Sequence, residues 1–320
     1  MPKVLLLIWA SALLLGCSKS SGTKDTDAGM DTETETGTDT EAGTEPDAGT
    51  ERDTGTDTEA DAGTDASVEP MENQWIEISG GTFTQGSEED LELDIDYTWY
   101  PMPTPEHTVT VPDFSIQKTE VTLGQYNACI AAGVCSDPEA EIPTFCASYN
   151  EWNDAERVNH PVDCVSYPQA ARYCEWIGGR LPTESEWEYA ARSQGKDYAR
   201  PWGNTEATCE YAALMEENTY GCGTGDVWPV CSFPKGNTEQ ELCDMVGNVF
   251  EITADALHRT YEDAPSDGSA WMEEEDSRCI VRGGSFREPP VYLRTTFRGL
   301  GPFLSGLQKG TGRIGFRCAK

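Results

Sequence analysis

The sequence predicts an α+β domain with little regular secondary structure, held together by disulfide bonds. Short helices are indicated by capping boxes, and short β-like runs alternate with segments rich in glycine and proline. The chain also contains 12 cysteines in 320 residues, a content typical of exported proteins with several disulfides. These three observations together favour an irregular, loop-rich fold.

Three helices are expected where a Ser or Thr is followed three residues later by Gln or Glu. In such a box the two side chains satisfy backbone N–H groups that the first helical turn leaves without partners. The boxes and the helices they open are Thr122/Gln125 with 123–132, Ser166/Gln169 with 167–177, and Thr183/Glu186 with 184–192. The expected strands are 75–79, 108–111, 114–121 and 279–282.

The N-terminus has the pattern of a bacterial export signal. Lys3 precedes an apolar run over residues 4–15, which is too short to span a bilayer, since a span needs about 20 residues. The run ends in Leu-Leu-Gly-Cys, which resembles a lipobox, so we expect residues 1–16 to be removed and Cys17 to be lipidated. The alternative is an ordinary signal peptide with an incidental cysteine. Ser18 after Cys17 favours the outer membrane.

Residues 17–70 are low in complexity, consisting mainly of Thr, Asp, Glu, Gly and Ala without any aromatic residue. Such a segment cannot bury enough apolar surface to offset its chain entropy. We therefore expect a disordered acidic tether that holds a domain formed by residues 71–320 away from the membrane. The 57 acidic and 22 basic residues of the chain also argue against a nucleic-acid partner, because phosphate binding requires basic patches.

The eleven cysteines other than Cys17 all lie in the domain, at positions 129, 135, 146, 164, 174, 209, 222, 231, 243, 279 and 318. Because eleven is odd, at least one thiol must stay free or pair with another molecule. The connectivity does not follow from the sequence. Local pairs such as Cys129–Cys135 and Cys209–Cys222 are plausible.

An ordered series of motifs runs through the domain from residue 75 to residue 319. Its members are ISGGTF (78–83), EHTV (106–109), KTEVT (118–122), HPV (160–162), GRLPTESEWEYAAR (179–192), PWGN (201–204), DMVGNVFE (244–251), RGGSF (282–286) and GFR (315–317). The series resembles the formylglycine-generating enzyme family, also called sulfatase-modifying factors. The resemblance implies an irregular fold of the C-type-lectin-like kind, but the chemistry depends on individual site residues.

The oxidases of this family use two cysteines that bind copper(I), an ion that prefers soft thiolate ligands. By the resemblance these cysteines fall two and seven residues after the aromatic residue of the RGGSF motif. The matching positions hold Glu288 and Leu293, and no cysteine occurs between Cys279 and Cys318. The sequence therefore predicts neither copper binding nor the oxidase reaction.

A structural calcium site is also implied by the resemblance, at the DMVGNVFE stretch. Asp244 and Glu251 would contribute carboxylates, and Gly247 and Val249 would contribute backbone carbonyls. The alternative is that both acids are ordinary solvated or capping carboxylates. The acids of the GRLPTESEWEYAAR motif are expected to cap helices and to form buried ion pairs.

The leading hypothesis is a surface lipoprotein whose domain acts as a non-oxidase binding or assembly module. A candidate cleft near Ser285, Glu288, Arg294 and Arg298 would hold a peptide or a glycan. The second hypothesis is an enzyme with altered chemistry that uses Glu288 or a cysteine elsewhere. A third is a structural envelope protein without a ligand. Convergence of the four cleft residues in a concave site would favour catalysis.

Overall fold

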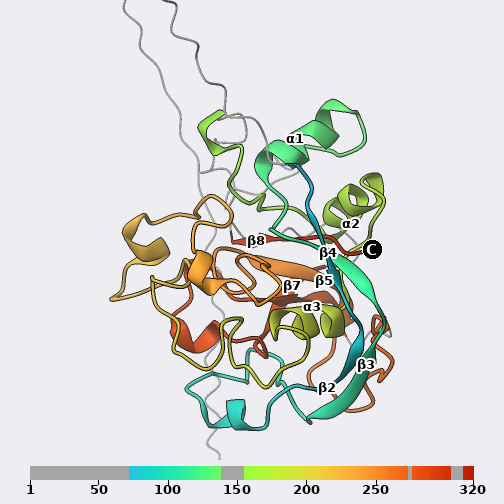
Figure 1. Cartoon of the computed structure of the whole chain (residues 1–320), viewed down its shortest axis with the longest axis vertical. Coiled ribbons are helices and arrows are strands. Elements are labelled where there is room, and N and C mark those ends of the chain that lie inside the picture. The colour runs from blue at the N-terminus through green and yellow to red at the C-terminus, as the bar shows by residue number, and fades with distance from the viewer. Residues whose placement is uncertain (1–71, 138–154, 273–275, 304–312) are drawn as a thin grey trace, which may run out of the picture. The chain divides into compact units, whose positions relative to one another are not determined.

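The computed structural model describes residues 72–137, 155–272, 276–303 and 313–320 (Figure 1). The predicted signal, Cys17 and the predicted tether lie outside these residues. The described part is an α+β fold in which three short helices and eight short strands are joined by long loops. This is the predicted fold class. None of the described helices is long and apolar enough to cross a membrane.

The three predicted helices are confirmed, each ending one residue before the predicted end. They are α1 (Leu123–Ala131), α2 (Tyr167–Trp176) and α3 (Glu184–Ala191). Each begins with the expected reciprocal capping box, formed by Thr122, Ser166 and Thr183 with the Gln or Glu three residues later. All eight residues of α3 are buried, and this helix packs against β2, β3, β5 and β6.

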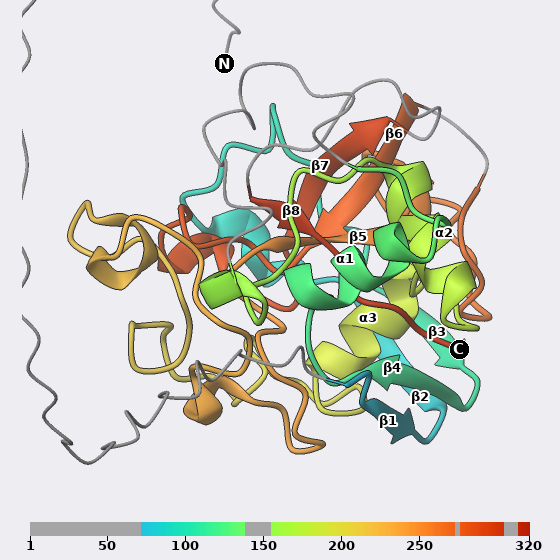
Figure 2. The same cartoon turned by 90° about the horizontal axis from the view of Figure 1, so that it is seen from above.

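Two antiparallel strand pairs and one four-stranded sheet form the rest of the scaffold (Figures 1 and 2). In the sheet, β5 pairs in parallel with β8, whereas the β5–β6 and β6–β7 pairs are antiparallel. The pairs are β1 (Trp75–Ile78) with β4 (Phe114–Gln117) and β2 (Gly81–Gln85) with β3 (His107–Val111). The sheet order is β7 (Arg298–Phe303), β6 (Asp276–Arg282), β5 (Phe250–Leu257) and β8 (Ile314–Gly315).

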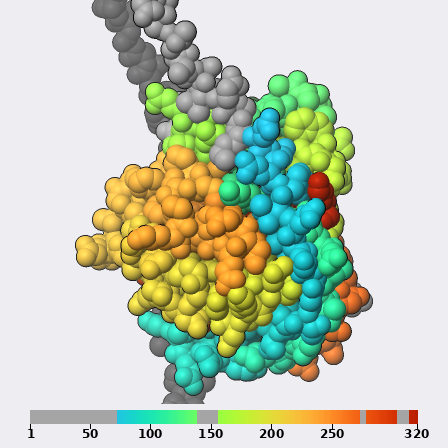
Figure 3. Space-filling model, in the orientation of Figure 1, coloured from blue at the N-terminus to red at the C-terminus, as the bar shows by residue number. Residues whose placement is uncertain are grey.

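Short 3₁₀ helices lie in the connections. They are η1 (Glu89–Glu92), η3 (Ala155–Arg157), η4 (Tyr220–Gly223), η5 (Pro234–Gly236) and η6 (Pro290–Tyr292). The loops over residues 200–250, yellow to orange in Figure 3, form much of the visible face. The Cys209–Cys222 and Cys231–Cys243 disulfides cross-link these loops.

Four disulfides join described cysteines, including both local pairs that the sequence suggested. They are Cys129–Cys135, Cys174–Cys318, Cys209–Cys222 and Cys231–Cys243. Cys164 is disulfide-bonded as well. Among the described cysteines only Cys279 is free, and it is completely buried. This thiol has no solvent access.

Candidate functional site

The GRLPTESEWEYAAR motif and the Arg of RGGSF build a buried ion-pair network. Arg282 has no exposed surface and donates to Glu184 Oε1 at 2.6 Å and to Glu188 Oε2 at 2.7 Å. The Tyr261 hydroxyl lies 3.0 Å from the same guanidinium, which also sits 5.2 Å from the centre of the Trp187 ring. A buried guanidinium needs such partners, since an unpaired charge in the interior is strongly unfavourable.

Arg298 extends this network from β7. Its Nε and terminal nitrogen donate to the two oxygens of Glu184 at 2.7 and 3.0 Å. Burial alone would raise the pKa of Glu184, but Arg298 and Arg282 together lower it to about 2. The expectation that the motif's acids form buried ion pairs is thereby met. Arg298, which the sequence placed in a cleft, is completely buried within the scaffold.

Arg294 also bonds away from the expected cleft. Its guanidinium lies 2.7 Å from Asp90 Oδ1, and Thr296 donates to the other oxygen of the same carboxylate. Asp90 belongs to η1 and is buried. Of the four expected cleft residues, only Ser285 and Glu288 are hydrogen-bonded to each other, whereas Arg294 and Arg298 pair with other carboxylates.

Ser285 and Glu288 form a compact polar group with Arg313. The Ser285 hydroxyl donates to Glu288 Oε2, and Arg313 donates to Oε1. Glu288 is mostly buried, and this burial raises the pKa of its carboxyl group, although Arg313 and Ser285 oppose the shift. The Arg313 side chain remains 35% exposed. No sequence motif singled out Arg313, which immediately precedes β8, the strand that pairs with β5.

Two tyrosines stand next to this polar group. Tyr100 and Tyr292 are half-buried, with ring centres 5.6 Å apart, and both contact the buried Phe297 ring. Burial raises the pKa of Tyr100, and the negative charge of Glu288 adds to the effect. Their partly exposed rings can make apolar and stacking contacts with a ligand. Tyr100 was not identified from the sequence, because it lies in an irregular segment without a motif.

The positions that match the oxidase cysteines cannot supply a copper site. Glu288 is bonded to Ser285 and Arg313, and Leu293 is completely buried against the backbone of Gly284. Burial also raises the pKa of Cys279, the free described thiol, so its reactive thiolate form is disfavoured. These residues do not fit copper(I), which requires thiolate ligands.

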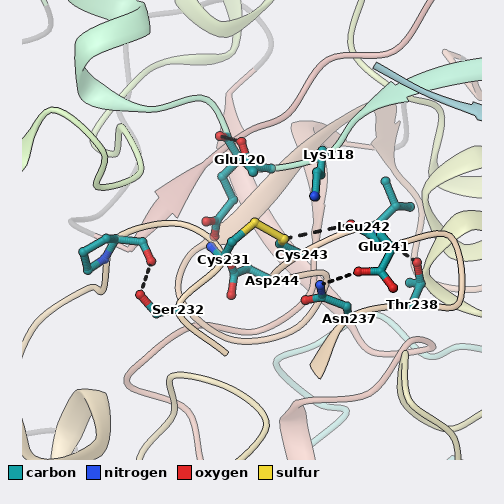
Figure 4. The surroundings of a disulfide bond; sticks show 12 residues. Lys118, Glu120, Cys231, Ser232, Asn237, Thr238, Glu241, Leu242, Cys243 and Asp244 are labelled. Atoms are coloured by element: carbon teal, nitrogen blue, oxygen red, sulfur yellow. Dashed lines mark hydrogen bonds between the residues drawn. A yellow bond between two sulfur atoms is a disulfide. The ribbon is translucent and has the colours of Figure 1, made fainter. Parts of the chain in front are cut away.

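The DMVGNVFE stretch forms a tight turn before β5. Asp244, Gly247 and Asn248 all have positive φ angles, and Asp244 Oδ2 accepts the Cys231 N–H at 2.6 Å. Figure 4 shows Asp244 beside the Cys231–Cys243 disulfide, with Glu120 nearby. Glu120 accepts hydrogen bonds from the Asn248 side chain at 2.9 Å and the Val249 N–H at 3.2 Å.

Around this turn, the buried carboxylates outnumber the buried guanidinium groups. Glu120, Asp244 and Glu251 are all buried, and Arg317 is the completely buried guanidinium that bonds both oxygens of Glu251 at 2.7 Å. Burial, followed by the charges of Asp244 and Glu251, raises the pKa of Glu120 well above its usual value. Burial likewise raises the pKa of Asp244 to about 6. Excess buried carboxylate of this kind fits the charge of a calcium ion.

Few side chains at this turn could serve as metal ligands. Within the described residues, no three His, Cys, Asp and Glu side chains are grouped so that they could hold a metal ion. A calcium ion would therefore need the backbone carbonyls of Gly247 and Val249 beside the carboxylates of Asp244 and Glu251, the set that the family resemblance implies. Main-chain carbonyls are ordinary calcium ligands.

Comparison with known proteins identifies the family. The sulfatase-modifying factor enzyme 1-like domain matches residues 60–320. The chain belongs to this family. The formylglycine-generating enzyme of Mycobacterium tuberculosis is 28% identical, over 78% of this chain and 98% of the relative. The protein named inactive C-alpha-formylglycine-generating enzyme 2, from Bos taurus, is 34% identical over 51% of each chain.

Among solved structures, that of PvdO from Pseudomonas aeruginosa is similar to the described fold. It superimposes with a TM-score of 0.59 and 30% sequence identity, covering 77% of this chain and 93% of PvdO. Family and fold class are thus those predicted from the motif series.

Proposed function

We propose that the domain is a non-oxidase binding or assembly module of this family, displayed by a surface lipoprotein. The observation that carries this proposal is the replacement of the two oxidase cysteines by Glu288 and Leu293, one ion-paired and the other buried in the core. The separation of Arg294 and Arg298 into other ion pairs adds support, because the cleft residues do not converge as a catalytic site would require.

The surface around Glu288 is the proposed ligand site. Arg313 offers a planar set of N–H donors, and Tyr100 and Tyr292 offer aromatic faces beside it. Guanidinium donors with adjacent aromatic rings suit the carbonyl and hydroxyl groups of a peptide or a glycan. We therefore propose one of these two classes as the ligand.

The oxidase reaction provides the direct test. The purified protein is incubated with a sulfatase-type cysteine peptide, with and without copper(I), and the peptide is analysed by mass spectrometry. We expect no aldehyde product, whereas an active formylglycine-generating enzyme serves as the positive control. A peptide of aldehyde mass above the no-protein background would refute the proposal. Installing Glu288→Cys and Leu293→Cys need not restore activity, because Pro289 and Pro290 stiffen the intervening segment.

A second candidate function is an enzyme that uses Glu288 as an acid or base. The hydrogen bond from Ser285 and the raised pKa of Glu288 favour this alternative, because catalytic carboxyl groups are tuned in the same way. Turnover of any peptide or glycan found to bind would support it if Glu288→Gln abolished turnover and retained binding. Binding without turnover by the unaltered protein would exclude it for that ligand.

The lipoprotein part of the proposal is based on the N-terminal sequence. Residues 1–16 would be removed, and Cys17 would carry the lipid that attaches the chain to the envelope at the outer membrane. Residues 17–70 would act as the tether. Cys17→Ala should move the protein from the membrane fraction to the soluble fraction. An intact mass of the mature chain without acyl groups at Cys17 would refute the anchor.

We further propose that calcium stabilises the domain at the DMVGNVFE turn. Asp244 and Glu251 would hold the ion through carboxylates, and Gly247 and Val249 through carbonyls. Calcium bound there would offset the buried negative charge to which Glu120 contributes. Its role would be structural.

A further inference from the structure

A separate groove lies between α2, the start of α3 and the loop over residues 267–270. It encloses about 510 Å³, within the range of pockets that bind small ligands. Tyr167, Ala171 and Glu175 line it from α2 at successive helical turns, and Leu181 and Ala254 line it from the scaffold. Its lining includes none of the residues around Glu288.

The walls of the groove are fixed by hydrogen bonds. The Tyr167 hydroxyl donates to Ala254 O at 3.2 Å, which ties α2 to β5. The Thr183 hydroxyl donates to Gly268 O at 2.9 Å, which ties the 267–270 loop to the start of α3. A preformed groove binds with a smaller ordering cost than one that must assemble around its ligand.

Acidic residues outnumber basic residues among those that line the groove. Arg180 forms a two-point ion pair with Glu186, at 2.6 and 2.7 Å, so these two charges cancel. Glu175 and Asp267 remain, and within the described part of the chain neither bonds to a cationic group. Hydrogen bonds from the side chain and backbone of Ser269 lower the pKa of Asp267, which keeps it ionised.

We propose that this groove binds a lysine or arginine side chain of a peptide segment. The cationic head would pair with Glu175 or Asp267, which line the groove from a helix and a loop respectively. The apolar stem would pack against Tyr167, Ala171 and Leu181. The net charge of −35 would also attract basic segments over a distance and raise their association rate.

The proposal is tested with two peptides that differ only in charge. Acetyl-Leu-Lys-amide and the same peptide with an acetylated lysine side chain are titrated into the protein, in which alanine methyl groups carry ¹³C. The charged peptide should shift the methyl signals of Ala171, Ala254 and Ala270, and the neutral one should bind at least about fivefold more weakly. Equal binding of both peptides, or shifts confined to other alanines, would overturn the proposal.

Variants distinguish binding in the groove from a general electrostatic attraction to an acidic protein. The double variant Glu175→Gln/Asp267→Asn should weaken binding of the charged peptide by about fivefold, while the melting temperature confirms folding. Glu262→Gln removes an exposed charge outside the groove and should leave binding unchanged. Equal weakening by both variants would overturn the proposal. The outcome is independent of the ligand proposed at Glu288.

Discussion

The buried network around Arg282 and the polar group around Glu288 are adjacent in sequence but differ in how far their arginines are exposed to solvent. Arg282, Arg298 and Arg317 have no exposed surface, and each is bonded to at least one buried carboxylate. At Glu288 the arginine partner is Arg313, which keeps about a third of its side-chain surface exposed. The first region resembles a rigid interior, whereas the second can meet a ligand.

This difference explains why the motif series identifies the fold better than the activity. GRLPTESEWEYAAR, RGGSF and GFR supply the acids and arginines of buried ion pairs, whose loss would leave a charge unpaired in the interior. Glu288 and Leu293, which by the resemblance match the oxidase cysteines, lie outside these motifs. A chain can therefore retain the scaffold of the family without cysteines at these two positions.

The largest expected effect is the loss of Arg282. Arg282→Met leaves Glu184 and Glu188 with less compensating charge in the interior, so the free energy of unfolding should fall by about 3–5 kcal/mol. Arg180→Met is the control, because the Arg180 side chain is 48% exposed and its pair with Glu186 should contribute about 0–1 kcal/mol. Urea unfolding measures both. Similar losses would remove the distinction between a buried and a half-exposed arginine partner.

The buried carboxyl group of Asp255 should make the stability of the scaffold depend on pH. Its carboxylate accepts the N–H groups of Glu184 and Trp271, yet burial raises its pKa to about 7. A raised pKa means that the folded state binds the proton of Asp255 more tightly than the unfolded state does, so protonation adds to the free energy of unfolding. This added stability is fully present below pH 4 and is lost as the pH rises towards 7. Asp255→Asn should make stability less pH-dependent over pH 4–7, by about 2–4 kcal/mol.

Denaturant unfolding at several pH values would show this effect. Asp263→Asn, at an exposed position, is the matched control, and its stability should vary with pH as that of the unaltered protein does. Parallel profiles for the unaltered protein and Asp255→Asn would contradict the assignment of this pH dependence to Asp255.

We expect calcium to stabilise the domain through the DMVGNVFE turn proposed to bind it. At a calcium concentration about 100-fold above the dissociation constant, the stabilisation would be about 2.7 kcal/mol. For a domain of this size that corresponds to a rise in melting temperature of about 5–10 °C. Asp244→Ala should abolish the rise, and Glu262→Ala should preserve it. A melting temperature that does not rise when calcium is added to protein first shown to contain none would exclude the site.

The smallest effect is expected at Glu288. Because its partner Arg313 is partly exposed, Glu288→Gln should change the free energy of unfolding by about 1 kcal/mol or less. Glu184→Gln, within the buried network, should cost several times more, about 3 kcal/mol. A loss at Glu288 as large as that at Glu184 would place Glu288 in the scaffold and weaken its assignment to the ligand surface.

Local signals in the sequence predicted the helices well and the strands unevenly. The three capping boxes fixed the helix starts, because each box is complete within four residues. β5 was missed although apolar and polar residues alternate along it. Its Glu251, Thr253 and Asp255 are buried, bonded to Arg317, Ile280 O and the Glu184 N–H respectively. β7 was missed because its sequence, RGLGPF, contains glycine and proline.

The sequence by itself determined the family, the fold class, the helix starts and the absence of cysteine at positions 288 and 293. Each of these depends on residue identity within a short stretch or on a fixed order of motifs. Only the tertiary structure decided which charges are neutralised. Arg298 pairs with Glu184 across 114 residues and Arg313 with Glu288 across 25, whereas Arg294 is taken by Asp90. Chain folding brings these partners together, and burial then makes pairing obligatory for one arginine and leaves another accessible to a ligand.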